Sequence, residues 1–195
     1  MAITAAMVKE LREMTGAGMM DCKKALTETN GDMDAAVDVL KKSGAAKMEK
    51  KQSRIAAEGI ARVAVNGNVA VVAEVNSETD FVAKNETFQE FVQTVADTAL
   101  ASDLNGGANG EDIEALLATN GLSDLLVEKT ATIGEKLSVR RFAKVTGDAV
   151  ASYIHGGGRI GVVIAADGAS DDAAKEALTN IAMQVAAMNP QYISC

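Results

Sequence analysis

The sequence predicts an α+β fold, in which a small helical bundle precedes a two-part core of antiparallel β-sheets with packed helices. Apolar residues recur at helical spacing over the first 45 residues, which predicts several short helices. Residues 59–75, and a second region that begins near residue 138, alternate with the two-residue period of half-buried strands. A chain of 195 residues with 48% apolar composition can bury a core in one or two compact units.

Three helices are expected in the first 45 residues. Thr4 can cap the first, which ends at the turn of residues 15–18, and the second runs from about residue 19 to the stop signal Asn30-Gly31. Asp32 can cap the third, in which four apolar residues fall on one face: Met33, Ala36, Val37 and Leu40. These helices predict a small bundle of the ubiquitin-associated type.

A basic segment follows the bundle. Residues 41–54 hold six basic residues and one acidic residue, a net +5, whereas residues 55–195 hold nine basic and 19 acidic residues, a net −10. We favour a solvated helical linker for this segment. A basic docking strip for RNA or for an acidic partner is the alternative.

The strand patterns lie on either side of a helical region. Residues 59–75 predict a hairpin around Asn66-Gly67, and a helical stripe of Phe88, Phe91, Val92, Val95 and Ala99 follows. A glycine-rich loop at 105–110 leads to another helix from Glu111, and the strands after residue 138 precede a last helix that starts at Asp171. On that helix four apolar residues fall on one side: Leu178, Ile181, Ala182 and Val185. The expected parts are 1–54, 55–147 and 148–195.

Composition argues against several classes of function. A net charge of −8 disfavours nucleic acid as the main partner, since phosphate binding depends on Lys and Arg. No apolar run approaches the roughly 20 residues that cross a bilayer, and the N-terminus does not resemble a signal peptide, so we expect a cytoplasmic protein. Cys22 and Cys195 are expected to be reduced.

Catalytic residue types are scarce, and we expect neither covalent catalysis nor a metal or cofactor. His155 is the single histidine, and no serine or cysteine lies in a nucleophile-elbow context. The stretch GGGRIG (156–161) matches a dinucleotide-binding pattern only formally, because the residues after it predict a strand and not a helix. A hairpin turn is the better interpretation, with His155 as an ordinary loop residue or, alternatively, a surface contact.

Two other stretches have open interpretations. Phe81 lies seven residues before Phe88, so a helix that starts early would bury both rings, with Asp80 as its cap. Alternatively, the turn presents Asp80 and Phe81 outward to a partner, and periodicity does not decide between the two. Met19 and Met20 point about 100° apart on a helix, so at least one should be exposed unless both enter the core.

Several segments resemble those of bacterial elongation factor Ts: LREMTGAGMMDCKKAL (11–26), EVNSETDFVAK (74–84), IGEKLSVRRF (133–142), SYIHGGGRIGVVIA (152–165) and AMNPQYIS (187–194). The resemblance spans essentially the whole chain. It implies a guanine nucleotide exchange factor that binds elongation factor Tu in its GDP-bound and nucleotide-free states, without covalent chemistry.

The resemblance also implies roles for individual residues. In the family the motif matched by Thr79, Asp80, Phe81 and Val82 is a wedge: Phe81 would enter between helices of the partner's nucleotide domain, disturb the Mg²⁺ and phosphate sites, and release GDP. Three N-terminal residues match a surface that meets the GTPase domain: Arg12, Met19 and Met20. Two core residues, His155 and Gly156, match a second contact.

One departure from the family pattern concerns the C-terminus. Family members with both core halves usually continue beyond the segment matched by residues 187–194, so we expect a C-terminally incomplete core, with self-association left open. Two other classes of function make different predictions. A peptide-binding adaptor would bind through residues 1–54 alone, and an RNA-binding module would lose affinity steeply with salt. Neither accounts for residues 79–82.

Overall fold

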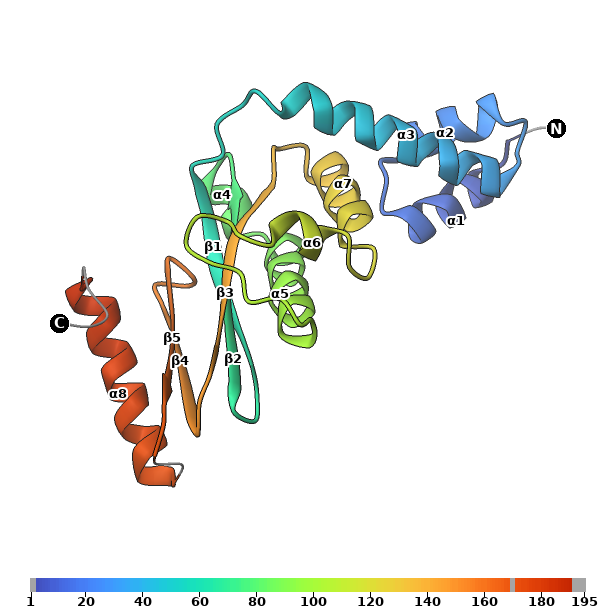
Figure 1. Ribbon diagram of the computed structural model, residues 1–195. Coiled ribbons are helices and arrows are strands. Elements are labelled where there is room, and N and C mark those ends of the chain that lie inside the picture. Colours follow the sequence, from blue (N-terminus) through green and yellow to red (C-terminus); the bar gives the residue numbers. More distant parts are fainter. Residues whose placement is uncertain (1–2, 169–170, 191–195) are drawn as a thin grey trace. The chain divides into compact units, whose positions relative to one another are not determined.

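The structure is a computed structural model that describes residues 3–168 and 171–190 (Figure 1). The chain forms two compact units. The first, here called the helical unit, comprises Met1–Ile55 and Ser123–Leu137, and the second, the sheet unit, comprises Ala56–Leu122 and Ser138–Cys195. No helix within the described ranges is both long enough and apolar enough to span a membrane.

The helical unit begins with the three predicted helices: α1 (Ala5–Thr15), α2 (Met19–Glu28) and α3 (Met33–Lys51). The Thr4 hydroxyl accepts the Met7 N–H at 3.3 Å, and the Asp32 carboxylate accepts the Ala35 N–H at 3.0 Å, so both predicted caps are confirmed. The small core of these helices is formed by Val8, Leu11, Cys22, Ala25, Leu26 and Ala36. The likeness to ubiquitin-associated domains stays a prediction.

The basic segment is the second half of α3, and it packs against a helix that the sequence did not predict. That helix is α7 (Leu122–Ile133). Gly44 is buried in α3, and a Cβ atom there would lie 3.1 Å from Val127 Cγ1, so the two helices approach closely. Lys136, just after α7, donates to the Gln52 carbonyl at 2.7 Å. The segment is therefore helical as expected, but one side of it is a packing surface.

The sheet unit contains two antiparallel sheets, which confirms the predicted α+β class. The first sheet has the strand order β1 (Glu58–Asn66), β2 (Val69–Ser77), β3 (Ser138–Thr146), and the second pairs β4 (Ala149–His155) with β5 (Ile160–Ala166). The β1–β2 hairpin forms as predicted, but its loop is Gly67-Asn68, because Asn66 pairs with Val69. Gly67 takes the positive φ of 59° that the first position of such a turn requires.

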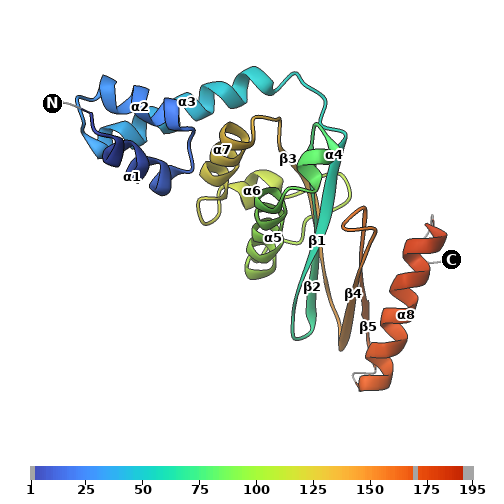
Figure 2. The same cartoon turned by 180° about the vertical axis from the view of Figure 1, so that it is seen from behind.

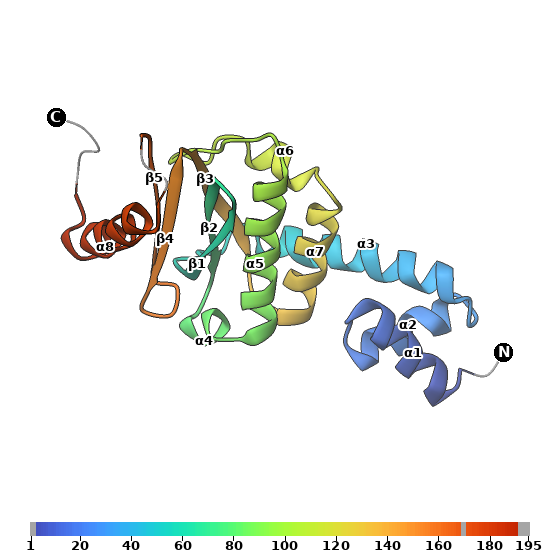
Figure 3. The same cartoon turned by 90° about the horizontal axis from the view of Figure 1, so that it is seen from below.

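The elements of the sheet unit stack in four layers, which Figures 2 and 3 show from two sides. Helix α5 (Glu86–Ala101) covers one face of the first sheet, the second sheet lies on the other face, and α8 (Asp172–Met188) covers the second sheet. Two short helices, α4 (Asp80–Ala83) and α6 (Ile113–Leu117), lie in the connections. The predicted stripe of α5 is buried, with Phe88, Val92 and Val95 each at 0% exposure.

The last helix agrees with the prediction except at one position. The Asp171 carboxylate accepts the Ala174 N–H at 2.8 Å and caps α8, as expected. Leu178 and Ala182 are buried against the second sheet, but Ile181 is half exposed. The buried face of α8 therefore does not include Ile181, which the sequence placed on it. Cys195 and residues 191–194 lie outside the described residues.

Candidate functional site

The segment that carries Asp80 and Phe81 is a helix of four residues at the end of a central strand. Strand β2 ends at Ser77, and the buried Ser77 hydroxyl donates to the Thr79 carbonyl at 3.1 Å. The Thr79 hydroxyl then accepts the Val82 N–H at 3.4 Å, so Thr79 caps α4. The interpretation in which Asp80 is the cap is therefore wrong.

Phe81 points away from the fold. Its exposed fraction is 81%, whereas that of Phe88 is 0%, so the interpretation that buries both rings is wrong. The reason is a break between the helices: Asn85 takes an extended conformation and its side chain accepts the Phe88 N–H at 3.2 Å, which starts α5 afresh. Because α4 and α5 are separate helices, the seven-residue spacing does not place the two rings on one face.

Asp80 lies beside the exposed ring as a carboxylate. Its Oδ2 atom is 2.7 Å from Lys84 Nζ, one helical turn later. The hydrogen bond and the charge of Lys84 lower the pKa of Asp80, and the more distant charge of Arg159 lowers it further. The exposed apolar ring of Phe81 is thus accompanied by an ionised carboxylate, paired with Lys84, at neutral pH.

The second predicted contact is the turn between β4 and β5. His155 ends β4 and is exposed, with its Nδ1 atom 3.1 Å from the Tyr153 hydroxyl oxygen. Gly156, Gly157 and Gly158 all have positive φ, at 59°, 71° and 112°, and strand β5 follows Arg159. Glycine tolerates these angles without steric strain. The GGGRIG stretch is therefore a hairpin turn, as predicted.

Both elements lie against the edge strand β1, side by side in Figures 1, 2 and 3. The outward-pointing N–H of Ala61 donates to the Gly158 carbonyl at 2.7 Å, so the turn covers part of the free edge of β1. The structure thus brings Asp80 and Phe81 together with the His155–Gly156 turn at one end of the sheet unit. Sequence alone does not show this, because about 75 residues separate them.

The three N-terminal candidates belong to the helical unit. Arg12 lies in the last turn of α1 and is exposed, and the turn of residues 16–18 separates it from the first residues of α2. Met19 and Met20 are exposed by 56% and 75%. Core packing of both methionines is thereby excluded. Flexible, polarisable methionine side chains on a surface suit contact with another protein.

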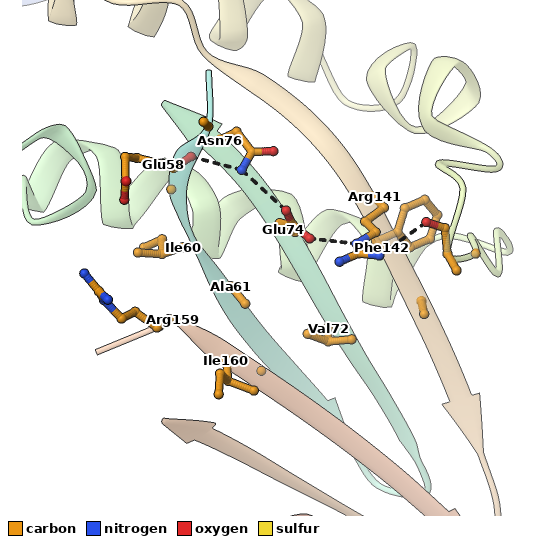
Figure 4. A pocket seen from close by; sticks show the side chains of 17 residues that line it. Glu58, Ile60, Ala61, Val72, Glu74, Asn76, Arg141, Phe142, Arg159 and Ile160 are labelled. Atoms are coloured by element: carbon orange, nitrogen blue, oxygen red, sulfur yellow. Dashed lines mark hydrogen bonds and ion pairs between the residues drawn. The ribbon is translucent and has the colours of Figure 1, made fainter. Parts of the chain in front are cut away.

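The sheet unit also contains a hollow of about 640 Å³ that the sequence did not predict (Figure 4). Ile60, Ala61 and Val72 contribute its apolar lining. Glu74 in this hollow contacts Arg141 at 2.7 Å and Arg140 at 3.6 Å, so its charge is already neutralised. Glu74 and Arg141 lie in segments that resemble the family, but nothing in those segments predicts that they line a hollow. Over residues 3–168 and 171–190, no three His, Cys, Asp or Glu side chains group as metal ligands would.

A comparison with protein families gives a match that covers more than half of the chain. The sequence model of the family described as Elongation factor TS matches residues 78–195. The matched range includes α4 and the β4–β5 turn, whereas Arg12, Met19 and Met20 lie outside it.

Proposed function

Because the chain belongs to the elongation factor Ts family, we propose that it releases GDP from elongation factor Tu by inserting Phe81, with Asp80 beside it, into the nucleotide-binding domain of that protein. The family match supports a role in translation elongation, which in this family is generally nucleotide exchange on elongation factor Tu. The insertion of these two residues is the finer step that we add. Such a factor would act in the cytoplasm, where translation takes place.

The observation that carries the proposal is the position of Phe81. The ring is 81% exposed at the end of a central strand, on a short helix that the Thr79 cap and the neighbouring Lys84 contact hold in shape. An aromatic side chain that is already outside the core can be buried in a partner without any rearrangement of its own fold. Hot spots of protein interfaces are typically such preorganised aromatic anchors.

Insertion of the ring would act on the nucleotide through the groups that bind its phosphates. A phosphate-binding loop holds its nucleotide through backbone N–H donors and a metal ion. Charge-assisted hydrogen bonds of this kind depend strongly on distance, so a small displacement of the loop or the metal weakens them. The carboxylate of Asp80 would add repulsion toward the phosphates and attraction toward the cation they share, which favours their separation.

Exchange of this kind is a linkage between two binding equilibria. The factor must bind nucleotide-free elongation factor Tu more tightly than the GDP-bound form, and by reciprocity GDP then weakens the binding of the factor by the same ratio. No covalent step is required. We propose Arg12, Met19 and Met20, and separately His155 and Gly156, as further contacts that supply binding energy without touching the nucleotide.

The proposal is tested by the release of a fluorescent GDP analogue from elongation factor Tu. We expect the chain to accelerate release and Phe81→Ala to remove most of this acceleration. Ile181→Ala is the matched control, since it truncates a half-exposed apolar side chain on α8, far from α4 in the sequence, and should leave the rate unchanged. Equal acceleration by Phe81→Ala and by the unaltered chain would show that the ring is not the wedge.

A further inference from the structure

We propose that Arg62 and Gln89 are positioning residues that hold α4 and the β4–β5 turn together as one surface. The inference rests on the proposed function in one respect, because this surface is the one assigned above to elongation factor Tu. It goes beyond that function by naming two residues that act through the contact residues and set their geometry.

Arg62 connects β1 to the turn. The residue follows Ala61 on the edge strand, and its guanidinium Nη1 donates to the Gly157 carbonyl and to the Ala61 carbonyl, both at 3.4 Å. The Ala61 N–H donates to Gly158 in the same region, at 2.7 Å. A Cβ atom on Gly158 would lie 2.9 Å from Arg62 Nη1, so the turn fits closely around the guanidinium.

Gln89 continues the connection to α4. Its Oε1 accepts from Arg62 Nη2 at 2.9 Å, and its Nε2 donates to the carbonyl of Ala83, the last residue of α4, at 3.3 Å. Because a guanidinium has only donors, the amide oxygen of Gln89 must face Arg62, and its NH₂ group must then face Ala83. The two side chains therefore form one directed chain of hydrogen bonds from the turn to α4.

The connection matters because neither element is stable in isolation. A helix of four residues has too few internal hydrogen bonds to persist alone, and a turn with three glycines of positive φ has few side chains to fix it. Arg62 and Gln89 are both half-buried, and the hydrogen bonds from Arg62 to Gln89 and from Gln89 to Ala83 are partly shielded from water, whereas the bond from Arg62 to Gly157 is exposed. Loss of either side chain should loosen both elements while the sheet and α5 keep their cores.

The same helix offers a matched control. Gln93 lies one turn after Gln89 on α5, and its Nε2 donates to the Val63 carbonyl of β1 at 3.1 Å. It thus links the same helix to the same strand through the same kind of group, but its hydrogen bonds go to Val63 and Asp97 and not to α4 or the turn. Gln93→Met should leave both elements as they are.

The first test uses amide hydrogen exchange of the full chain without a partner. For Arg62→Met and Gln89→Met we expect exchange about three- to tenfold faster at residues 82–84 and 156–158, the range that corresponds to the loss of one hydrogen bond. Gln89→Glu keeps the acceptor for Arg62 but cannot donate to Ala83, so it should loosen α4 alone. Unchanged exchange at both segments in the two methionine variants would overturn the inference, whatever the chain does to elongation factor Tu.

The second test asks whether the connection serves nucleotide exchange. In a double-mutant cycle, Gln89→Met should slow GDP release severalfold with Phe81 present and much less in the Phe81→Ala background, because it positions a ring that is then absent. A general structural defect would give equal losses in both backgrounds and a lower melting temperature, and that result would overturn the positioning role. If the unaltered chain fails to accelerate release, the proposed function is wrong, and hydrogen exchange alone decides on the connection.

Discussion

Phe81→Ala should remove most of the acceleration of nucleotide exchange with little effect on the stability of the fold. A phenylalanine buries about 200 Å² when it is fully enclosed, and at 81% exposure only about 40 Å² of Phe81 is covered within the chain. At about 25 cal/mol per Å², truncation should lower the free energy of unfolding by at most about 1 kcal/mol. The remaining area of about 160 Å² is available to a partner.

The same area sets the expected loss of function. Complete burial of about 160 Å² gives an upper bound of about 4 kcal/mol, and aromatic hot spots cost about 2 kcal/mol or more on truncation. At a subsaturating concentration of the factor, its acceleration of GDP release should therefore fall by about 30- to 1,000-fold. The measurements are release of a fluorescent GDP analogue and urea unfolding of the same variant.

Phe88→Ala is the contrasting substitution. Phe88 lies seven residues later, at the start of α5, and its exposure is 0%. Its truncation should lower the free energy of unfolding by about 3–5 kcal/mol through lost burial and a cavity. If Phe81→Ala destabilised the chain as much as Phe88→Ala, the ring would be part of the core; if it left both stability and GDP release unchanged, the proposed role of Phe81 would be refuted.

Three further predictions concern other parts of the chain. Lys84 lowers the pKa of Asp80, so an NMR titration should place that pKa below the one of an unperturbed aspartate and show it return toward the ordinary value in Lys84→Met. The contribution of Asp80 to stability is present above the unfolded pKa and is lost as pH falls through the lower folded pKa. Burial raises the pKa of the Cys22 thiol. In a Cys195→Ser background, iodoacetamide should therefore react slowly with Cys22 until the chain unfolds. The free energy of unfolding should fall as pH rises past about 8.5, because the unfolded thiol ionises there while the folded thiol stays protonated. Gly158→Ala should destabilise the chain by about 1–3 kcal/mol in thermal unfolding, because a Cβ there would lie 2.9 Å from Ile60 Cβ at a φ of 112°, and Gly157→Ala, with no atom within 4 Å, should cost less.

Features that depend on neighbouring residues could be predicted from the sequence. The caps at Thr4, Asp32 and Asp171 act on N–H groups three residues later, so their signals are local and their positions were correct. The apolar stripe of α5 was likewise readable, because helical periodicity alone places those side chains on one face. Asn85 is a further capping signal of this kind; it separates α4 from α5 and argues against the interpretation in which Phe81 is buried with Phe88.

By itself, then, the sequence determined the fold class, most of the elements and, through resemblance to a family, the segment that carries Asp80 and Phe81. Only the tertiary structure decided that Phe81 is exposed beside the His155 turn, that α7 packs against Gly44, and that Arg62 and Gln89 link the two candidate contact elements. The physical reason is separation along the chain. The Arg62–Gly157 contact joins residues 95 positions apart and the Arg62–Gln89 contact residues 27 apart, and no local periodicity or cap reports which distant groups a folded chain brings within hydrogen-bonding distance.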